Sequence, residues 1–304
     1  MNTTLLKKLA ILAVFLCSSL LSTGQDQWQW WNEKVNWDGV TSWREYLILS
    51  PKYMGPNALP VPPMKNGRFK NATTFTTGIS YHHNEGDKTT DLLLDFFAPL
   101  ADDIAGLHLW MVPVEFYRMD TNTRDVRRSR DYDGKGFSLG DVYIGTFIQL
   151  LKDHEKLPDL LLTINLKTPS GSNLSGARYT DTPGYFFDIS AGKSFPVSGS
   201  SVQIRPSIMT GFYAFQTNLD VYLQNDAVMY GAALEVLTPK IRWQTKLTGY
   251  AGYIDNGDKP MVLRLAAETR PRNKTAFRLF LEHGLNDFPY TSVRVSMVFQ
   301  IPGL

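Results

Sequence analysis

The feature that most constrains this 304-residue chain is an alternation of apolar and polar side chains with a period of two residues, which runs from Phe75 onward. Within residues 91–100, for example, Leu92 and Leu94 share one face, and Asp91 and Asp95 share the other. This period is typical of β-strands with one apolar face. About twelve such segments, many near the ~10 residues of a tilted membrane strand, begin near Phe75, Thr89, Gly106, Ser138, Pro158, Gly184, Val202, Ala227, Ile241, Pro260, Lys274 and Tyr290.

The lengths of these segments favour a membrane barrel over a soluble sandwich, whose strands have a mode of about 5–6 residues. After residue 24, no apolar stretch approaches the length of a transmembrane helix. A chain without spanning helices satisfies its backbone in lipid only as a closed barrel. We therefore predict an all-β fold, a closed antiparallel transmembrane β-barrel of about twelve strands over residues 75–304.

The predicted connections differ in length between the two ends of the barrel. Residues 120–137, 170–184 and 216–226 form long polar connections, and residues 238–240 and 271–273 form tight ones on the other side. Long external loops and short periplasmic turns are typical of outer-membrane barrels. We therefore expect the outer membrane of a Gram-negative bacterium as the location, with its lipid around the barrel.

Aromatic residues toward the ends of the predicted strands suggest two girdles at the membrane surfaces, where amphipathic rings prefer to lie. The residues concerned are Trp110, Tyr117, Tyr143, Tyr185, Phe186, Tyr213, Trp243, Tyr250, Tyr253 and Tyr290.

Residues 1–24 have the pattern of a secretory signal peptide. Lys7 and Lys8 precede an apolar run over residues 9–21, and Ser22 and Gly24 are small residues before a cleavage site. An uncleaved anchor is the alternative. Removal of this segment leaves 29 basic residues against 29 acidic residues, and it removes the single cysteine. The mature chain would therefore have no disulfide and no thiolate metal site, and its neutrality argues against a nucleic-acid partner.

Residues 25–74 precede the predicted barrel and lack clear periodicity. Seven Pro and Gly residues between 51 and 67 exclude a regular element there. Buried tryptophans would order such a segment. We expect a plug in the lumen or at its periplasmic mouth; the alternatives are an arm that docks a protein partner and a platform for sugar rings. These roles would fall to Trp28, Trp30, Trp31, Trp37 and Trp43.

The charged residues of the alternating segments lie on the face opposite the apolar one, which would be the lumen. The expected lumen-lining residues are Asp91, Asp95, Glu115, Asp141, Asp188, Arg205, Glu235, Arg242, Lys246, Arg264, Glu268, Arg278, Glu282 and Arg294. The earlier strands contribute mostly acids and the later ones most of the arginines, which would create a transverse field. Cross-strand ion pairs are the alternative: Glu268–Arg278, Arg264–Glu282, Glu282–Arg294 and Glu235–Arg242.

Catalytic and metal motifs are weak in this sequence. Ser80, His82, His83 and Asn84 lie close together, but spacing alone does not define a catalytic triad. Residues 131–136 have acidic residues at alternate positions followed by a glycine, as in a calcium-binding loop. However, the position six residues after Gly134, where an acidic ligand is expected, is occupied by Gly140. We therefore expect no enzyme, no bound metal and no cofactor.

Short motifs resemble two known families. Gly140-Asp141-Val142 and residues 165–171 are similar to outer-membrane barrels of the meta-pathway-of-phenol-degradation type. Over most of the mature chain, residues 55–62 (GPNALPVP), 177–181 (ARYTD), 256–260 (NGDKP) and 284–288 (GLNDF) resemble an uncharacterised barrel family of Bacteroidota. The resemblance implies an outer-membrane location and no established substrate.

These observations favour a porin-like protein that transports a small solute as a passive or weakly selective channel. The first alternative is a non-transporting barrel that docks a periplasmic or surface protein through residues 25–74 or 120–137. The second is a lipid-modifying enzyme of the outer membrane.

Overall fold

The computed structural model describes residues 27–69, 71–101 and 104–302. The expected signal peptide lies outside these residues. The chain divides into two compact units, one that ends at Tyr46 and one that begins at Leu47, and each is described by itself. None of the helices in the described ranges is long and apolar enough to cross a membrane.

The first unit contains the five tryptophans of the N-terminal extension. The helix α2 (Gln29–Val35) ends at Asn36, which adopts the left-handed conformation that commonly terminates helices. The 3-10 helix η1 (Trp43–Tyr46) follows. Trp31 is buried, and its ring lies 5.8 Å from that of Tyr46 in an edge-on arrangement. The two helical turns therefore share one small apolar contact.

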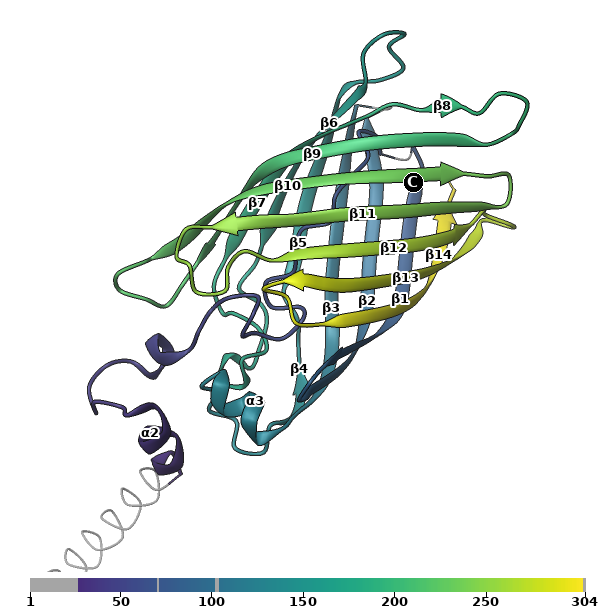
Figure 1. Cartoon of the computed structure of the whole chain (residues 1–304). Helices are drawn as coiled ribbons and strands as arrows, with labels where there is room; N and C mark the ends of the chain where they lie inside the picture. Colours follow the sequence, from purple (N-terminus) through teal and green to yellow (C-terminus); the bar gives the residue numbers. More distant parts are fainter. Residues whose placement is uncertain (1–26, 70, 102–103, 303–304) are drawn as a thin grey trace, which may run out of the picture. The chain divides into compact units, whose positions relative to one another are not determined.

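The second unit is built almost entirely from antiparallel strands (Figure 1). Its twelve long strands in the described part of the chain are β1 (Thr73–Asn84), β2 (Asp87–Ala101), β3 (Ala105–Met119), β5 (Val142–Leu151), β6 (Asp159–Lys167), β7 (Gly184–Gly192), β9 (Gln203–Gln216), β10 (Gln224–Leu237), β11 (Ile241–Gly252), β12 (Met261–Thr269), β13 (Thr275–Asn286) and β14 (Thr291–Ile301). Two short strands, β4 (Lys135–Ser138) and β8 (Phe195–Pro196), pair beside β3 and β9.

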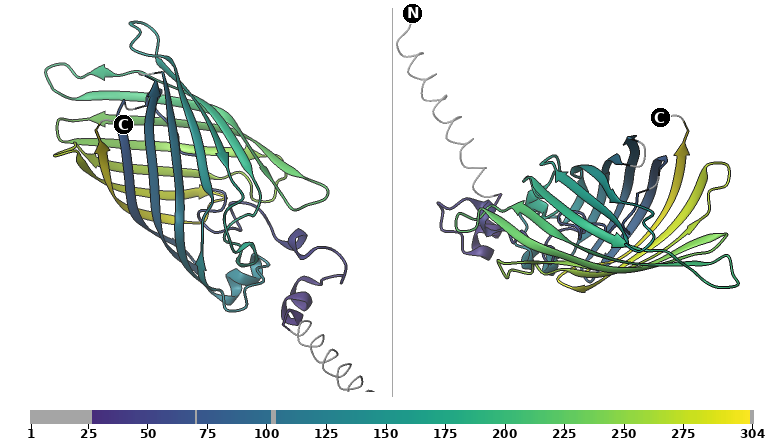
Figure 2. Two further views of the ribbon diagram at one scale, coloured as in Figure 1. Left: turned by 180° about the vertical axis from the view of Figure 1, so that it is seen from behind. Right: turned by 90° about the horizontal axis from the view of Figure 1, so that it is seen from above.

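The sheet closes on itself. Strand β1 pairs with β14 from Thr73↔Ile301 to His83↔Thr291, and every other neighbour along the barrel is also antiparallel. In Figures 1 and 2, strands β9–β13 cross the strands behind them at a steep angle, as tilted barrel strands do. The predicted closed twelve-stranded barrel is confirmed. Among the early strands, the predicted and observed first residues differ most for β5, which was predicted to begin near Ser138 and begins at Val142. The reason is that residues 135–138 form the separate strand β4.

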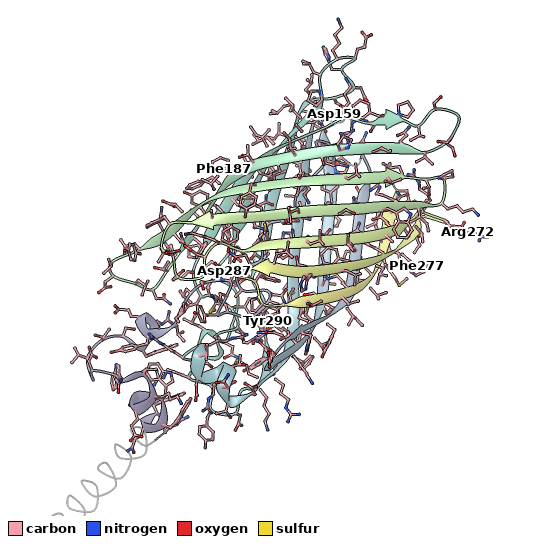
Figure 3. The ribbon with its side chains drawn as sticks, viewed as in Figure 1. Asp159, Phe187, Arg272, Phe277, Asp287 and Tyr290 are labelled. Carbon is pink, nitrogen blue, oxygen red and sulfur yellow. The ribbon has the colours of Figure 1, made fainter. Side chains whose placement is uncertain are left out.

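Alternation along each strand separates an apolar outer face from a polar lumen. Phe187 and Phe277 project outward from the barrel wall (Figure 3). Like them, the following outward side chains are apolar and exposed: Ile79, Ile144, Ile164, Leu166, Ile189, Leu234, Leu265, Leu279, Val293 and Val295. An outer surface of this kind matches lipid tails and gives water no polar partner.

The two ends of the barrel differ as predicted at several connections, but residues 85–86 are a tight turn at the loop end and residues 193–202 are a long connection at the turn end. At the loop end, residues 120–141 contain α3 (Thr121–Val126) and β4, and residues 168–183 contain η2 (Leu174–Gly176). At the turn end, residues 238–240 and 270–274 connect neighbouring strands. Strand β1 begins and β14 ends at the turn end, because the barrel has an even number of antiparallel strands.

The prediction of two aromatic girdles is wrong for most of the residues named. Tyr143, Tyr213, Tyr250 and Tyr290 are each at most 2% exposed and point into the lumen. They pack with Phe186, Phe215, Met209 and Met229, and with side chains that precede β1. Of the ten, Tyr185, Trp243 and Tyr253 are strongly exposed on the outside. The sequence did not reveal that the lumen contains an apolar partner for the inward rings.

Candidate functional site

Residues 47–69, here called the lumenal segment, pass through the inside of the barrel. Lys52 lies at the loop end, where its Nζ is 3.6 Å from Asp287 Oδ1. Arg68 lies at the turn end, where its Nε is 2.5 Å from Asp159 Oδ2. Asp159 and Asp287 lie at opposite ends of the barrel in Figure 3. The segment therefore runs the length of the lumen, from the loop end to the start of β1.

Prolines keep residues 60–66 of the lumenal segment extended, so the carbonyl groups there lack backbone partners within the segment. Basic side chains of the later strands satisfy them. Arg264 donates to the carbonyls of Val61 at 2.6 Å and Pro62 at 3.1 Å. Likewise Lys246 donates to the Met64 carbonyl at 3.0 Å, and Arg205 to the Asn66 carbonyl at 2.9 Å.

Acidic side chains of the earlier strands bind the segment through the side-chain amide of Asn57, near the loop end. Asn57 Nδ2 donates to Asp91 Oδ2 and to Glu115 Oε2, both at 2.7 Å. The acids of β2 and β3 and the bases of β9, β11 and β12 thus hold the segment from different sides. Glu235 is an exception among the later strands, since it accepts from Asn66 Nδ2 at 2.9 Å.

Apolar contacts complete the fit of the segment. Leu59, Val61 and Met64 are at most 2% exposed and pack in the cluster of inward aromatic rings. Burial of such side chains contributes about 1.5–3 kcal/mol each. The segment is thus an integral part of the packed lumen.

A buried ionic cluster covers the segment at the loop end. Arg178, from the connection between β6 and β7, lies 2.6 Å from Glu115 Oε1 and 2.8 Å from Asp87 Oδ2. Asp87 also binds Arg127 at 2.7 Å and accepts from the Tyr290 hydroxyl at 2.6 Å. Burial alone would lower the pKa of Arg178, but the two carboxylates outweigh it and raise the pKa well above its usual value. Arg178 therefore stays charged, and together with Arg127 it ties two loops to the barrel wall.

Two of the predicted cross-strand ion pairs are confirmed and two are wrong. Arg264 Nε lies 2.5 Å from Glu282 Oε2, and Arg278 Nη2 lies 2.5 Å from Glu268 Oε2. Glu235 faces Gln244, which donates to it at 2.5 Å, because the turn pairs Leu237 with Arg242. Arg294 faces Phe280, not Glu282, and its Nε donates to Ser80 Oγ at 2.7 Å.

The remaining charged residues named from the sequence are also directed away from the outer face. Asp95 lies 3.0 Å from His108 Nε2. Asp141, just before β5, lies 2.8 Å from Lys167 Nζ. Asp188 accepts from the Thr163 hydroxyl, and Arg242 lies 3.8 Å from Glu268. Sequence reasoning missed Lys65, Arg68, Asp87, Arg127, Asp159 and Arg178, because the first two lie outside the alternating region and the others lie at strand ends or in loops.

The structure brings a serine, a histidine and an acid together, although not the set named from the sequence. His82 Nδ1 lies 2.7 Å from Ser292 Oγ, and its Nε2 lies 2.7 Å from Asp91 Oδ2. Ser80 instead binds Arg294, and His83 is exposed on the other face. Ser292 is 2% exposed and is not among the residues that line the lumenal cavity. This arrangement connects β1, β2 and β14 and holds the carboxylate that binds Asn57.

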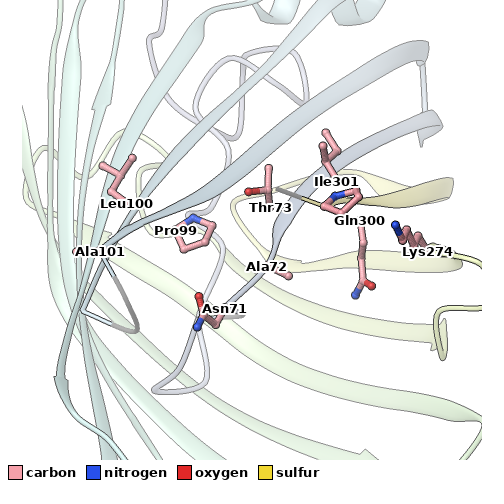
Figure 4. A pocket seen from close by; sticks show the side chains of 10 residues that line it. Asn71, Ala72, Thr73, Pro99, Leu100, Ala101, Lys274, Gln300 and Ile301 are labelled. Carbon is pink, nitrogen blue, oxygen red and sulfur yellow. The ribbon is translucent and has the colours of Figure 1, made fainter. Parts of the chain in front are cut away.

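A cavity of about 560 Å³ remains beside the lumenal segment. It extends from Asn57 and His82 toward Gln203 and Leu237, which lie at the turn end. A second pocket of about 530 Å³ lies at the turn end among Thr73, Pro99 and Gln300 (Figure 4), and Lys274 is its one charged lining residue in the described part of the chain. Among the described residues, no group of three His, Cys, Asp or Glu is placed to hold a metal ion.

Comparisons with known proteins establish the fold. Among solved structures, an outer-membrane channel from Pseudomonas putida F1 is similar, with a TM-score of 0.54 and 13% identity over 80% of this chain and 100% of that chain. The fold is that of an outer-membrane β-barrel. The NanC porin (TM-score 0.48, 9% identity, 75% and 100% coverage) and the KdgM porin (0.45, 8%, 74% and 99%) are similar too. No family model and no curated protein sequence matches the chain.

Proposed function

We propose that this protein is a channel for small solutes in the outer membrane, and that the lumenal segment closes it. The observation that carries this proposal is the cavity of about 560 Å³ beside a segment that side chains of the barrel wall hold in place. A barrel with a dry, fully packed interior would leave no such space. The apolar outer face would lie in the lipid of the membrane.

Closure in this proposal depends on the loop end. The backbone N–H of Gly55 donates to the Ala177 carbonyl at 2.8 Å, and Asn57 binds two buried carboxylates. Opening would require residues 54–60 to leave these partners while the barrel wall stays intact. The wall has its own continuous hydrogen-bonded ladder, so movement of the segment breaks no strand pairing.

Recordings in planar lipid bilayers test the proposal. We expect rare, small conductance steps for the full chain and frequent steps for Asn57→Leu, which keeps the side-chain size but removes the two hydrogen bonds. Lys52→Gln is the matched control, because it alters the same segment at a half-exposed ion pair. Folding of each variant is checked by the heat-dependent mobility typical of barrels on gels. If folded Asn57→Leu remains as silent as the full chain, the channel proposal fails.

A docking role is the second candidate, and the first unit favours it. Trp37 and Val40 are exposed there, and the five tryptophans lie outside the lumenal segment. Exposed apolar side chains often mark a protein-binding surface. Co-purification of one protein that is lost with Trp37→Ser, without any conductance, would support this role.

The four motifs that resemble the uncharacterised barrel family support a shared architecture with it. Gly55 lies against Arg178 of the second motif, Gly257 of the third lies near Lys52, and Asp287 of the fourth pairs with Lys52. The first two motifs thus meet at Gly55, and the last two meet at Lys52, both at the loop end. We propose that the chain belongs to that family and that the family shares this closure.

A further inference from the structure

The cavity beside the lumenal segment has a strongly basic wall. Eight lysine or arginine residues line the cavity, but only three acidic residues do, namely Asp95, Glu235 and Glu282. Arg205 and Arg68 share Asp159, and Arg68 also pairs with Asp153, whereas Arg242 and Arg278 share Glu268. With the pair Arg264–Glu282, the five paired bases thus have four carboxylates. The cavity therefore carries a net positive charge.

Three of these bases form no ion pair within the described residues, although Asp95, Glu235 and Asp91 lie near Lys65, Lys246 and Arg294. Lys246 donates to the Met64 carbonyl, and Lys65 Nζ lies 4.8 Å from the centre of the Phe147 ring. Arg294 donates to Ser80 Oγ and lies over the ring of Phe280 at 5.3 Å. A buried cation without a paired anion is costly. An anion that enters the cavity would reduce that cost.

The wall formed by β2, β3 and β5 carries most of the apolar side chains of the cavity, with Asp95 and His108 among them. Leu93 and Phe97 of β2, Trp110 and Val112 of β3, and Phe147 of β5 line it. The Trp110 ring stacks on Tyr143 at a centroid distance of 3.7 Å, which fixes its orientation. The basic residues Arg205, Arg242, Lys246, Arg264, Arg278 and Arg294 come from β9 and β11–β14. A molecule in the cavity therefore meets mostly cations on the side of β9 and β11–β14 and mostly apolar side chains on the other side, where Lys65 lies over the Phe147 ring.

We propose that this cavity binds a small organic carboxylate with an apolar body. The carboxylate would contact Lys246 or Arg294, and the apolar part would lie against Trp110. Anions without an apolar part would leave the ring wall in contact with water, and neutral apolar molecules would leave the cations unpaired. This inference rests on the proposed function, since it names the class of solute that the channel would accept.

Calorimetric titration of the full-length protein in non-ionic detergent tests the site directly. The probes are phenylacetate, its neutral isostere phenylacetamide, and acetate. We expect phenylacetate to bind about tenfold or more tightly than either of the others, which corresponds to about 1.4 kcal/mol. Equal affinity for phenylacetate and phenylacetamide would overturn the role of the cations. Equal affinity for phenylacetate and acetate would overturn the role of the rings.

Variants locate the site. The double variant Lys246→Gln/Arg294→Gln should lose about tenfold or more in phenylacetate affinity. Lys88→Gln, on the exposed outer face of β2, should leave the affinity unchanged. If both have the same affinity as the full chain, the carboxylate binds elsewhere and the inference fails. The comparison of the three probes on the unmodified protein decides the matter even if the double variant does not fold.

The two proposals fail independently. Phenylacetate binding without any conductance from Asn57→Leu would overturn the channel and leave the binding site. Conductance without preference for phenylacetate over phenylacetamide would overturn the binding site and leave the channel.

Discussion

Gly55 lies directly against the guanidinium group of Arg178. A Cβ atom on Gly55 would be 2.8 Å from Arg178 Cζ and 2.9 Å from its Nε. The guanidinium is the far end of a long side chain, but its ion pairs with Glu115 and Asp87 prevent it from moving away. Because Gly55 has no side chain, the lumenal segment can lie directly against the charged group of Arg178.

Gly55→Val should displace the lumenal segment at the loop end. The added side chain forces either the segment or Arg178 to move, and overpacking of this kind costs about 1–3 kcal/mol. We expect a lower temperature of unfolding and more frequent conductance steps. Lys52→Gln serves as the control in the same segment. An unchanged conductance with a lowered unfolding temperature would show that Arg178 moves and the segment does not.

Arg178→Met should destabilise the barrel strongly. The change leaves the buried Glu115 carboxylate without its guanidinium partner, and broken buried pairs cost about 3–5 kcal/mol. Addition of Glu115→Gln should recover a large part of this loss, because the unpaired charge is then absent. Urea unfolding in lipid vesicles, followed by fluorescence, measures both. Equal destabilisation in the single and double variants would contradict the role of the ion pair.

Ile164→Arg should cost about 2–4 kcal/mol if the residue lies near the bilayer midplane. Ile164 is 48% exposed on the outer face of β6. Ile164→Val is the matched control and should change the free energy of unfolding little. Thr163, its inward neighbour, is an unsuitable control because its hydroxyl donates to Asp188. Unfolding in vesicles compares the variants, and equal free energies for Arg and Val would contradict the lipid-facing assignment.

Arg264→Met and Arg278→Met should differ in their effect on the lumenal segment. Both arginines pair with a glutamate on the neighbouring strand, but only Arg264 also donates to the carbonyls of Val61 and Pro62. We expect faster hydrogen exchange over residues 59–66 in Arg264→Met only. Mass spectrometry of the proteolytic peptides measures this. Similar exchange in the two variants would mean that other contacts hold the segment.

Much of the barrel could be predicted because strand alternation is a local property. The face on which Asp91 or Leu94 lies depends on its own position along the strand, and the sequence shows that position directly. The pairs Arg264–Glu282 and Arg278–Glu268 were predictable for the same reason, since a tight turn sets their register. The prediction for Glu235 and Arg242 failed where the register differed by two residues from the one assumed.

The inward direction of Tyr143 and Tyr213 could have been read from their alternation with apolar outward residues. The residues on which these rings pack could not be predicted, because the sequence does not show what fills the lumen of a barrel. The rings pack on Leu59 and Val61, which belong to a segment without periodicity. The sequence indicated that this segment is irregular and rich in proline and favoured a plug, but it did not show which rings the segment would contact.

The sequence by itself determined the strands, their faces and the closed barrel, because a period of two residues assigns each side chain to lipid or lumen without knowledge of the rest of the chain. Only the tertiary structure decided that residues 47–69 run through the lumen and that the cavity beside them is basic on one wall and mostly apolar on the other. His82 and Ser292, 210 residues apart, meet only because β1 pairs with β14. Closure of the sheet creates such contacts, and no local pattern specifies which distant segment the closed barrel will enclose.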